Sequence, residues 1–291
     1  MRFLLQLING LQVGSIYALI ALGYTMVYGI VKLINFAHGD IIMVGAYAVL
    51  LTMTVLGWPV YLSIPFSILV CAAMGVIIER VAYKRLRSYA RISALITAIG
   101  VSLLLENSAQ LIFSPTARPF PTIVSMPPIV IGNLRVSFIT VLTLAISVLL
   151  MILLTIFVKR TKTGKAMRAV SEDMGAAQLM GINVNTTISI TFAIGSGLAA
   201  IGAVLYCASY PQVTPTMGMM PGLKAFIAAV LGGIGIIPGA MLGGFIMGIA
   251  ESLTKGFIST QLADAVVYGI LIVVLLVKPA GILGKKISEK V

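Results

Sequence analysis

Apolar residues occur along this chain in long runs that polar segments separate. A helix needs about 20 mostly apolar residues, at a rise of about 1.5 Å each, to cross about 30 Å of hydrocarbon. None of the runs has the short alternating pattern of a membrane β-barrel. The sequence therefore predicts an all-α polytopic membrane protein, a single domain over 1–291 with about eight membrane segments: about 4–31, 41–57, 60–78, 92–113, 136–158, 188–209, 223–250 and 264–277.

Composition agrees with a membrane protein. Charged residues make up 10% of the 291 residues and hydrophobic residues 59%, whereas an average soluble protein is about 25% charged. A soluble fold of this size could not cover its surface with so few charges. The net charge of +12 is then a matter of membrane topology rather than nucleic-acid binding, and we expect lipid, not nucleic acid, around the chain. The first run is too long for the apolar core of a signal peptide, so we expect it to be the first span.

Lys and Arg residues are concentrated in three segments, and this distribution predicts the orientation. The segments are 80–91, 159–168 and the tail that begins at Lys278 and includes Lys285, Lys286 and Lys290. Basic loops stay on the cytoplasmic side, so we expect all three, and the C-terminus, in the cytoplasm. The proline-rich loops 114–135 and 210–222 carry little charge and are expected outside.

A cluster of helix breakers lies inside the run 223–250. Glycine and proline destabilise a helix interior, and the cluster consists of Gly232, Gly233, Gly235, Pro238 and Gly239. A single span here would send the basic tail outside. Two helices that enter and leave on the same side would keep the tail inside, although a kinked ordinary span with a misjudged neighbour remains the alternative. Non-helical backbone at this depth must be buried in protein or face a water-filled cavity.

Enzyme signatures are absent from the sequence. The only histidine is His38, which excludes HExxH and histidine-rich metal sites, and neither G-x-S-x-G nor a Walker G-x-x-x-x-G-K-[ST] occurs. We therefore expect no catalytic residue, no metal and no cofactor. Energy for any transport would come from a gradient or from another subunit.

Polar residues inside the apolar runs are the candidates for a translocation path. Ionisable groups are costly in lipid and usually line a path or pair internally. Glu106 is the only carboxylate well inside a run, because Asp40, Glu251 and Asp264 lie at run ends, and this weakens a gradient-driven mechanism. Asp40 is expected to cap the next helix.

The first run carries polar side chains at a spacing of three residues, Gln6, Asn9 and Gln12. Such a stripe either forms hydrogen bonds between helices or lines a path, and Glu106 has the same two interpretations. The candidate path residues are Gln12, Tyr17, Asn35, His38 and Glu106.

The segment 159–187 carries a short amphipathic helix after its basic start. Ser171 can cap it, two acids follow where the helix dipole favours them, and Gly181 can end it. The helix, about 172–180, presents Met174, Ala177 and Met180 at helical spacing. It is expected to dock on a partner, the alternative being a helix that lies on the membrane surface.

Four motifs resemble permease subunits of branched-chain amino acid ABC importers of the LivH type. They are 14–19 (GSIYAL), 35–39 (NFAHG), 228–235 (AAVLGGIG) and 279–284 (PAGILG), and the similarity covers essentially the whole chain. The resemblance implies a bacterial inner-membrane complex of two related permeases, two cytoplasmic ATPases and an extracytoplasmic protein that delivers leucine, isoleucine or valine. Similar proteins handle urea or amides, which remains an alternative, as does a secondary transporter or channel.

The resemblance extends to the loop that couples such importers to their ATPases. Ala176, Ala177 and Gly181 match its A-A-x-x-x-G spacing. The pattern departs at position 175, which is glycine, the acids lie earlier, and no Leu-Pro follows. The residues that this resemblance assigns to ATPase coupling are Glu172, Asp173, Ala176, Ala177, Gly181 and Ile182.

Overall fold

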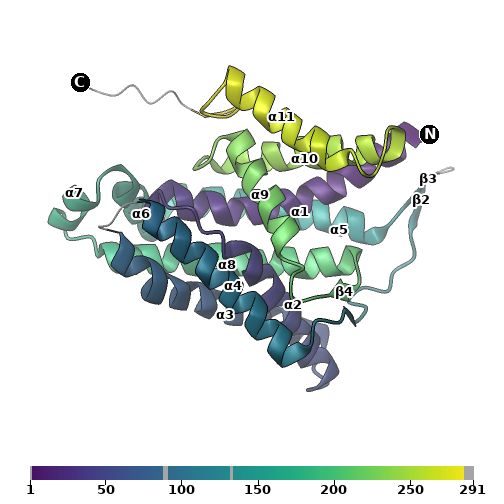
Figure 1. Cartoon of the computed structure of the whole chain (residues 1–291), viewed down its shortest axis with the longest axis horizontal. Coiled ribbons are helices and arrows are strands. Elements are labelled where there is room, and N and C mark those ends of the chain that lie inside the picture. Colours follow the sequence, from purple (N-terminus) through teal and green to yellow (C-terminus); the bar gives the residue numbers. More distant parts are fainter. Residues whose placement is uncertain (1, 88–90, 132–133, 285–291) are drawn as a thin grey trace.

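The computed structural model describes residues 2–87, 91–131 and 134–284 and is an elongated bundle of helices (Figure 1). The predicted lysines Lys285, Lys286 and Lys290 lie outside the described residues. The helices are α1 (Arg2–Val31), α2 (His38–Thr54), α3 (Val60–Ile78), η1 (Glu79–Tyr83), η2 (Lys84–Leu86), α4 (Arg91–Phe113), α5 (Phe138–Arg160), α6 (Lys162–Glu172), α7 (Met174–Leu179), α8 (Val184–Ser209), α9 (Met219–Gly232), α10 (Ile237–Phe257) and α11 (Ala263–Val277).

The expected all-helical membrane architecture is confirmed, but the number of spans differs from the predicted eight. Within the described ranges, six helices are long and apolar enough to cross a membrane by length and composition, and α2, α9 and α11 are shorter apolar helices. The difference arises at the runs 41–57 and 264–277, which form α2 with 17 residues and α11 with 15 residues. The run 223–250 still contributes one long helix, α10, although its first part forms the separate helix α9.

Short strands gather at one end of the bundle, and α6 and α7 lie at the other (Figure 1). Strand β1 (Arg118–Pro119) pairs antiparallel with β4 (Gln212–Val213), and β2 (Ile129–Ile131) pairs with β3 (Leu134–Val136). The pairing of β1 with β4 joins the two loops that the sequence predicts outside, 114–135 and 210–222.

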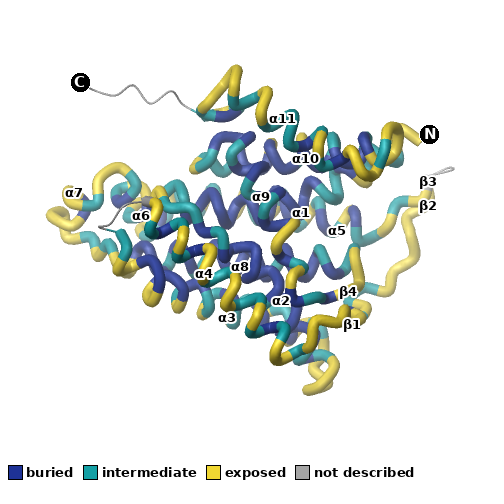
Figure 2. The backbone as a smooth tube through the Cα atoms, viewed as in Figure 1, coloured by how far each residue is buried: buried dark blue, intermediate teal, exposed yellow. Residues whose placement is uncertain are grey.

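Helix α1 forms the centre of the bundle, and Figure 2 shows most of its length buried. It packs most extensively on α10, where glycines of both helices meet. A Cβ added to Gly10 would lie 2.7 Å from Ile249 Cα, and one added to Gly14 would lie 2.9 Å from Gly244 O. Close approach of backbones at small residues is the usual way in which membrane helices associate. The glycines thus allow α10 to lie directly along α1.

The connection between α1 and α2 turns back into the bundle. The His38 ring, at the start of α2, packs edge-on against Tyr24 of α1 with 4.5 Å between ring centroids. Tyr24 lies two turns before the end of α1, so α2 begins beside the inner part of α1 rather than beyond it. In the non-helical segment 32–37, Asn35 and Ala37 are buried whereas Lys32 is exposed, so the part of the segment next to α2 is enclosed by protein, as backbone at membrane depth must be.

Helices α9 and α10 form an antiparallel hairpin. Gly233 and Gly235 adopt φ of 108° and 93° in the turn, a region that residues with a side chain rarely adopt, and Pro238 lies in the first turn of α10. Lys224 of α9 pairs with Glu251 of α10, far from the turn in sequence. The chain therefore reverses direction inside the run 223–250.

The segment after α11 closes this hairpin. Ile282 N donates to Leu231 O at 2.9 Å and Leu283 N donates to Gly232 O at 3.0 Å. Carbonyls in the last turn of a helix lack partners within it. The motif 279–284 thus satisfies the end of α9.

Candidate functional site

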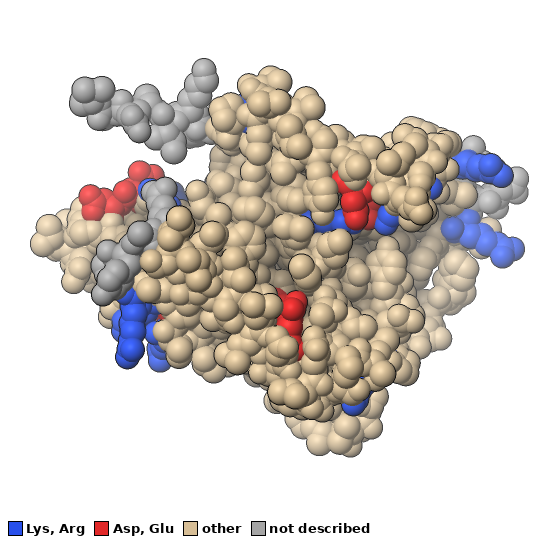
Figure 3. All heavy atoms as spheres, in the orientation of Figure 1, with Lys and Arg blue, Asp and Glu red and all other residues tan. Residues whose placement is uncertain are grey.

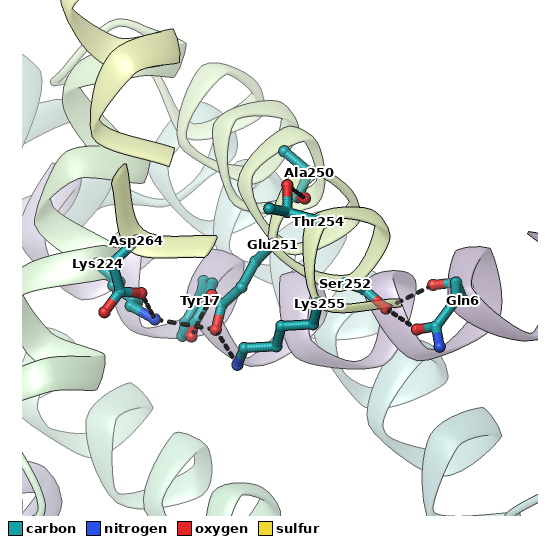
Figure 4. A network of polar contacts seen from close by, with 9 residues as sticks. All are labelled: Gln6, Tyr17, Lys224, Ala250, Glu251, Ser252, Thr254, Lys255 and Asp264. Carbon is teal, nitrogen blue, oxygen red and sulfur yellow. Dashed lines mark hydrogen bonds and ion pairs between the residues drawn. The ribbon is translucent and has the colours of Figure 1, made fainter. Parts of the chain in front are cut away.

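A buried ionic network joins four helices near the end of the bundle that carries the strands. Lys224 Nζ lies 2.9 Å from Glu251 Oε1 and 2.7 Å from Asp264 Oδ1. Lys255 Nζ lies 2.6 Å from the same Glu251 oxygen, and the Tyr17 hydroxyl donates to Glu251 Oε2 at 2.9 Å. Figure 4 shows Tyr17 of α1, Lys224 of α9 and Lys255 of α10 converging on Glu251, while Asp264 of α11 contacts Lys224. Each charge has an opposite charge beside it, as burial requires.

Glu106 lies well inside an apolar run of the sequence but is only half-buried in the fold, and a carboxylate at the end of a run is buried more deeply. Glu251 is 2% exposed, although it lies at the end of an apolar run. The hairpin of α9 and α10 places it against Lys224, and that pairing depends on a contact across 27 residues. No local pattern of residues could have revealed it.

A polar cavity of about 310 Å³ lies beside this network, between α1, α8 and α10. Its lining residues are Gln6, Asn9, Gln12, Val13, Ile16, Ser209, Tyr210, Glu251, Ser252 and Lys255. The predicted stripe on α1 therefore faces a cavity. Two of its members also join helices: Gln12 Nε2 donates to Ser209 Oγ at 2.8 Å, and the Ser252 hydroxyl donates to Gln6 Oε1 at 2.9 Å. The stripe therefore forms hydrogen bonds between helices and also lines a cavity.

A second cavity, of about 300 Å³, lies between α2, α4 and α9. It is lined by Tyr24, Phe36, Gly39, Asp40, Ile99, Ser102, Leu103, Glu106, Met219, Gly222 and Leu223. Glu106, a predicted path residue, thus shares a cavity with Asp40. The expectation that Asp40 caps α2 is wrong, because Ala37 occupies the N-cap position without a side-chain cap and Asp40 lies in the first turn.

The remaining path candidates line neither of these two cavities. Asn35 and His38 are buried. The Tyr83 hydroxyl donates to Asn35 Oδ1 at 3.1 Å, and His38 packs on Tyr24. In this structure both side chains hold the start of α2 against its neighbours.

A second ionic contact, which sequence reasoning missed, ties the loop after α3 to α8. The buried carboxylate of Glu79 pairs with Arg87 and accepts a hydrogen bond from Ser189 Oγ at 2.6 Å. Arg87 Nη1 also donates to Asn185 Oδ1 at 2.9 Å. Burial lowers the pKa of the Arg87 guanidinium, and the adjacent Glu79 carboxylate acts in the opposite direction. The start of α8, just after α7, is therefore held to the membrane helices.

The segment 159–187 differs in detail from the prediction. It contains two helices, α6 and α7, and Asp173 between them is extended with φ of −152°. Asp173 Oδ1 accepts the Ala176 N–H at 2.9 Å and so caps α7, whereas the Ser171 hydroxyl donates to Arg168 O. The predicted helix over 172–180 with a Ser171 cap is therefore wrong in its start, because the extended backbone at Asp173 separates it from α6.

The end of α7 has left-handed backbone at its glycine. Gly181 has φ of 81°, and Ile182 N donates to Ala177 O at 3.0 Å, a geometry that glycine adopts at little cost. Glu172 and Ala176 are exposed and Ile182 is half-buried.

The exposed side of α7 and its C-cap agrees only in part with the spacing of Met174, Ala177 and Met180. Ala177 is 4% exposed because it faces the protein, whereas Leu179 and Met180 are 90% and 82% exposed. Helix α7 lies at the tip of the molecule (Figure 1, left), so these two large, exposed apolar side chains are available to a partner.

Within the described ranges, no three His, Cys, Asp or Glu side chains lie close enough to hold a metal ion. Most of the polar groups described above are hydrogen-bonded, ion-paired or part of a cavity lining, whereas Asn35 Nδ2 and His38 Nε2 are buried without a hydrogen-bond partner in the part of the chain that the structure describes. Such an arrangement suits passage of a small polar solute.

Comparison with known proteins agrees with this geometry. A family model described as "Branched-chain amino acid transport system / permease component" matches residues 6–275. The chain belongs to this family. It is 45% identical to the high-affinity branched-chain amino acid transport system permease protein BraD of Pseudomonas aeruginosa, over all of this chain and 98% of that protein.

Two further relatives belong to the same group. The identity to LivH of Escherichia coli strain K12, a high-affinity branched-chain amino acid transport permease, is 44% over 99% of this chain and 98% of that protein. A probable branched-chain amino acid transport permease of Methanocaldococcus jannaschii is 30% identical over 93% of this chain and 89% of its own length. No solved structure matches the chain.

Proposed function

We propose that this chain is the permease subunit of an ATP-driven importer that brings leucine, isoleucine and valine into a bacterial cell. The names of the relatives given above describe branched-chain amino acid transport permeases. The complex would contain a second, related permease, two cytoplasmic ATPases and an extracytoplasmic binding protein. The observation that favours an ATP-driven importer over a secondary transporter is the pair of exposed apolar side chains on α7, since such a surface outside the membrane calls for a protein partner.

The orientation follows from the basic residues. The segments 80–87 and 159–168 lie with α6 and α7, so we infer that this end faces the cytoplasm. The strand end, with loops 114–135 and 210–222, would receive the binding protein. In Figure 1, α11 runs back toward the α6–α7 end, and this direction supports a cytoplasmic C-terminus.

The path would lie along the face that carries the two cavities. The side chains of Lys255 and Asp264 are 40% and 42% exposed, and Glu106 is half-buried. Besides the acidic atoms at the α6–α7 end, Figure 3 shows acidic atoms at two places on this face away from both ends. Partly exposed charges at this depth are unfavourable in lipid. We infer that the face is turned toward the second permease and a water-filled path between the two.

ATP-driven movement of α7 would alternate access to that path. The ATPases would contact Leu179 and Met180. The contacts of Glu79 and Arg87 with the start of α8 would then transmit the motion of α7 to the membrane helices. The coupling residues that the sequence suggested, Asp173 and Gly181, would then set the shape of α7 rather than touch the ATPase.

The test is co-purification of the complex with its ATPases, followed by leucine uptake in proteoliposomes. Leu179→Asp places a charge in the proposed apolar interface and should shed the ATPases. Loss of about 2 kcal/mol weakens an association roughly 30-fold. Met126→Asp, which changes an exposed apolar residue in the loop 114–135, is the matched control and should keep the ATPases bound. Full ATPase retention and uptake by Leu179→Asp would contradict the docking role of α7.

A further inference from the structure

Asp40, which is buried, and Glu106, which is half-buried, differ from the buried carboxylates Glu79 and Glu251. They line the same cavity of about 300 Å³, from α2 and from α4. Asp40 is 2% exposed, and its Oδ2 has no hydrogen-bond partner among the described residues. No Lys or Arg lines the cavity. Glu251 and Glu79, by contrast, are paired with cations.

Two unpaired carboxylates in one apolar cavity are energetically unfavourable. Burial of an isolated charge costs several kcal/mol unless a partner compensates it, and a second charge of the same sign adds repulsion. No Lys or Arg of the described cavity lining compensates these carboxylates. A positively charged group of a bound ligand would therefore stabilise them. Asp40 lines the cavity and its Oδ2 lacks a hydrogen-bond partner within the described chain, which marks the place for this group.

The other walls of the cavity indicate what carries that positive group. Most are apolar: Ile99 and Leu103 from α4, and Met219 and Leu223 from α9. A divalent metal prefers six or more oxygen ligands, and the cavity offers too few. An ammonium group attached to a branched aliphatic chain meets both the carboxylates and the apolar walls. The hydroxyls of Tyr24 and Ser102 also line the cavity and are neutral donors for a carboxylate.

We propose that Asp40 and Glu106 bind the α-ammonium group of the amino acid during its passage, with its aliphatic side chain against Ile99, Leu103 and Leu223. This inference rests on the proposed function and names a substrate site within it. The volume of about 300 Å³ lies at the small end of the range for ligand pockets, which suits a single amino acid. The cavity beside Glu251 is less suited to an ammonium group, because its carboxylate already has two lysines.

Uptake by the assembled importer in proteoliposomes tests the site. Glu106→Gln and Asp40→Asn remove one charge each with almost no change of shape. Either should lower the rate of leucine uptake about tenfold or more. ATP hydrolysis without binding protein and recovery of the complex should stay at the native level. Asn107→Ala is the matched control, because Asn107 is the exposed neighbour of Glu106 and bonds only its own helix at Leu103 O. It should transport normally.

A cysteine in the cavity gives a readout that does not depend on transport rate. Ser102→Cys should react with a small maleimide, whereas Cys71 and Cys207 are buried and should not. Leucine should protect Cys at this position. The analogue 4-methyl-2-hydroxypentanoate, which carries a hydroxyl in place of the ammonium, should not protect it. Adding Glu106→Gln should abolish the protection by leucine.

The outcomes separate this site from the importer function. Native rates of leucine uptake in both Glu106→Gln and Asp40→Asn would overturn the ammonium site. Equal protection of the cysteine by leucine and by the hydroxy analogue would also overturn the ammonium site. This test remains valid if the variants Glu106→Gln and Asp40→Asn fail to accumulate, because it does not use them. Absence of leucine uptake by the native complex would instead contradict the proposed function.

Discussion

Lys224 is bound by two carboxylates of very different burial, and this contrast yields a quantitative prediction. Glu251 is almost fully buried and accepts from Lys224, Lys255 and Tyr17. The Asp264 side chain is 42% exposed and contacts Lys224 at 2.7 Å. Glu251→Gln and Asp264→Asn each remove one negative charge beside the same lysine, so the pair isolates the effect of burial.

The magnitudes follow from the environment of each carboxylate. Breaking a buried ion pair costs about 3–5 kcal/mol. Lys224 keeps Asp264 and Lys255 can reach water, so we expect the lower limit, about 3 kcal/mol, for Glu251→Gln. An exposed pair contributes about 0–1 kcal/mol, and we expect that range for Asp264→Asn.

The assay is the apparent Tm of the purified permease in detergent. At about 2–4 °C per kcal/mol, the scale for domains of about 150–250 residues, Glu251→Gln should lower the Tm by about 6–12 °C. Asp264→Asn should lower it by less than about 4 °C. The double variant Glu251→Gln/Lys224→Met should lose less than the sum of its two single changes, because neither charge is then left without the other.

The result that would refute this reasoning is equal destabilisation by Glu251→Gln and Asp264→Asn. It would mean that burial does not govern the network. Strict additivity in the double variant would show that Lys224 and Glu251 are not coupled.

Three further predictions concern packing, capping and topology. Gly248→Val should abolish membrane accumulation, because its Cβ would overlap the backbone of α1. Gly269→Val, with open space around it, is the control and should accumulate normally. Equal membrane levels of the two variants would argue against the close contact of α10 with α1. Asp173→Ala should weaken ATPase binding about fivefold, because loss of an N-cap costs about 1 kcal/mol. Asp173→Asn keeps a capping oxygen and should bind the ATPase normally. If it does not, the negative charge of Asp173 rather than its cap is what matters. Single cysteines at Tyr210 and Leu262, both exposed and flanking the hairpin, should react with an impermeant maleimide from outside; labelling from opposite sides would contradict the hairpin.

Much of the architecture could be read directly from the chain. The apolar runs identified the membrane helices, since burial in lipid requires a continuous stretch of about 20 apolar residues. The glycines and Pro238 in the run 223–250 marked the place where α9 ends and α10 begins, because these residues oppose a helix locally. Gly181 was expected at the end of the coupling helix for the same local reason.

The tertiary structure decided which polar groups meet. Glu251 stands at the end of an apolar run, yet the hairpin buries it against Lys224. Asp40, expected as a cap, instead faces a cavity with Glu106. Ala177 has the helical spacing of an exposed position and is buried against the protein.

The physical reason is the range of the interactions. The tendency of a segment to enter a membrane and its tendency to form a helix depend only on its residues and their near neighbours. The sequence alone therefore determines both. The pairing of charges, and the side of a helix that stays exposed, depend on segments that lie far apart in the chain. Only the packing of α10 along α1, and of α9 against α10, brings those segments together.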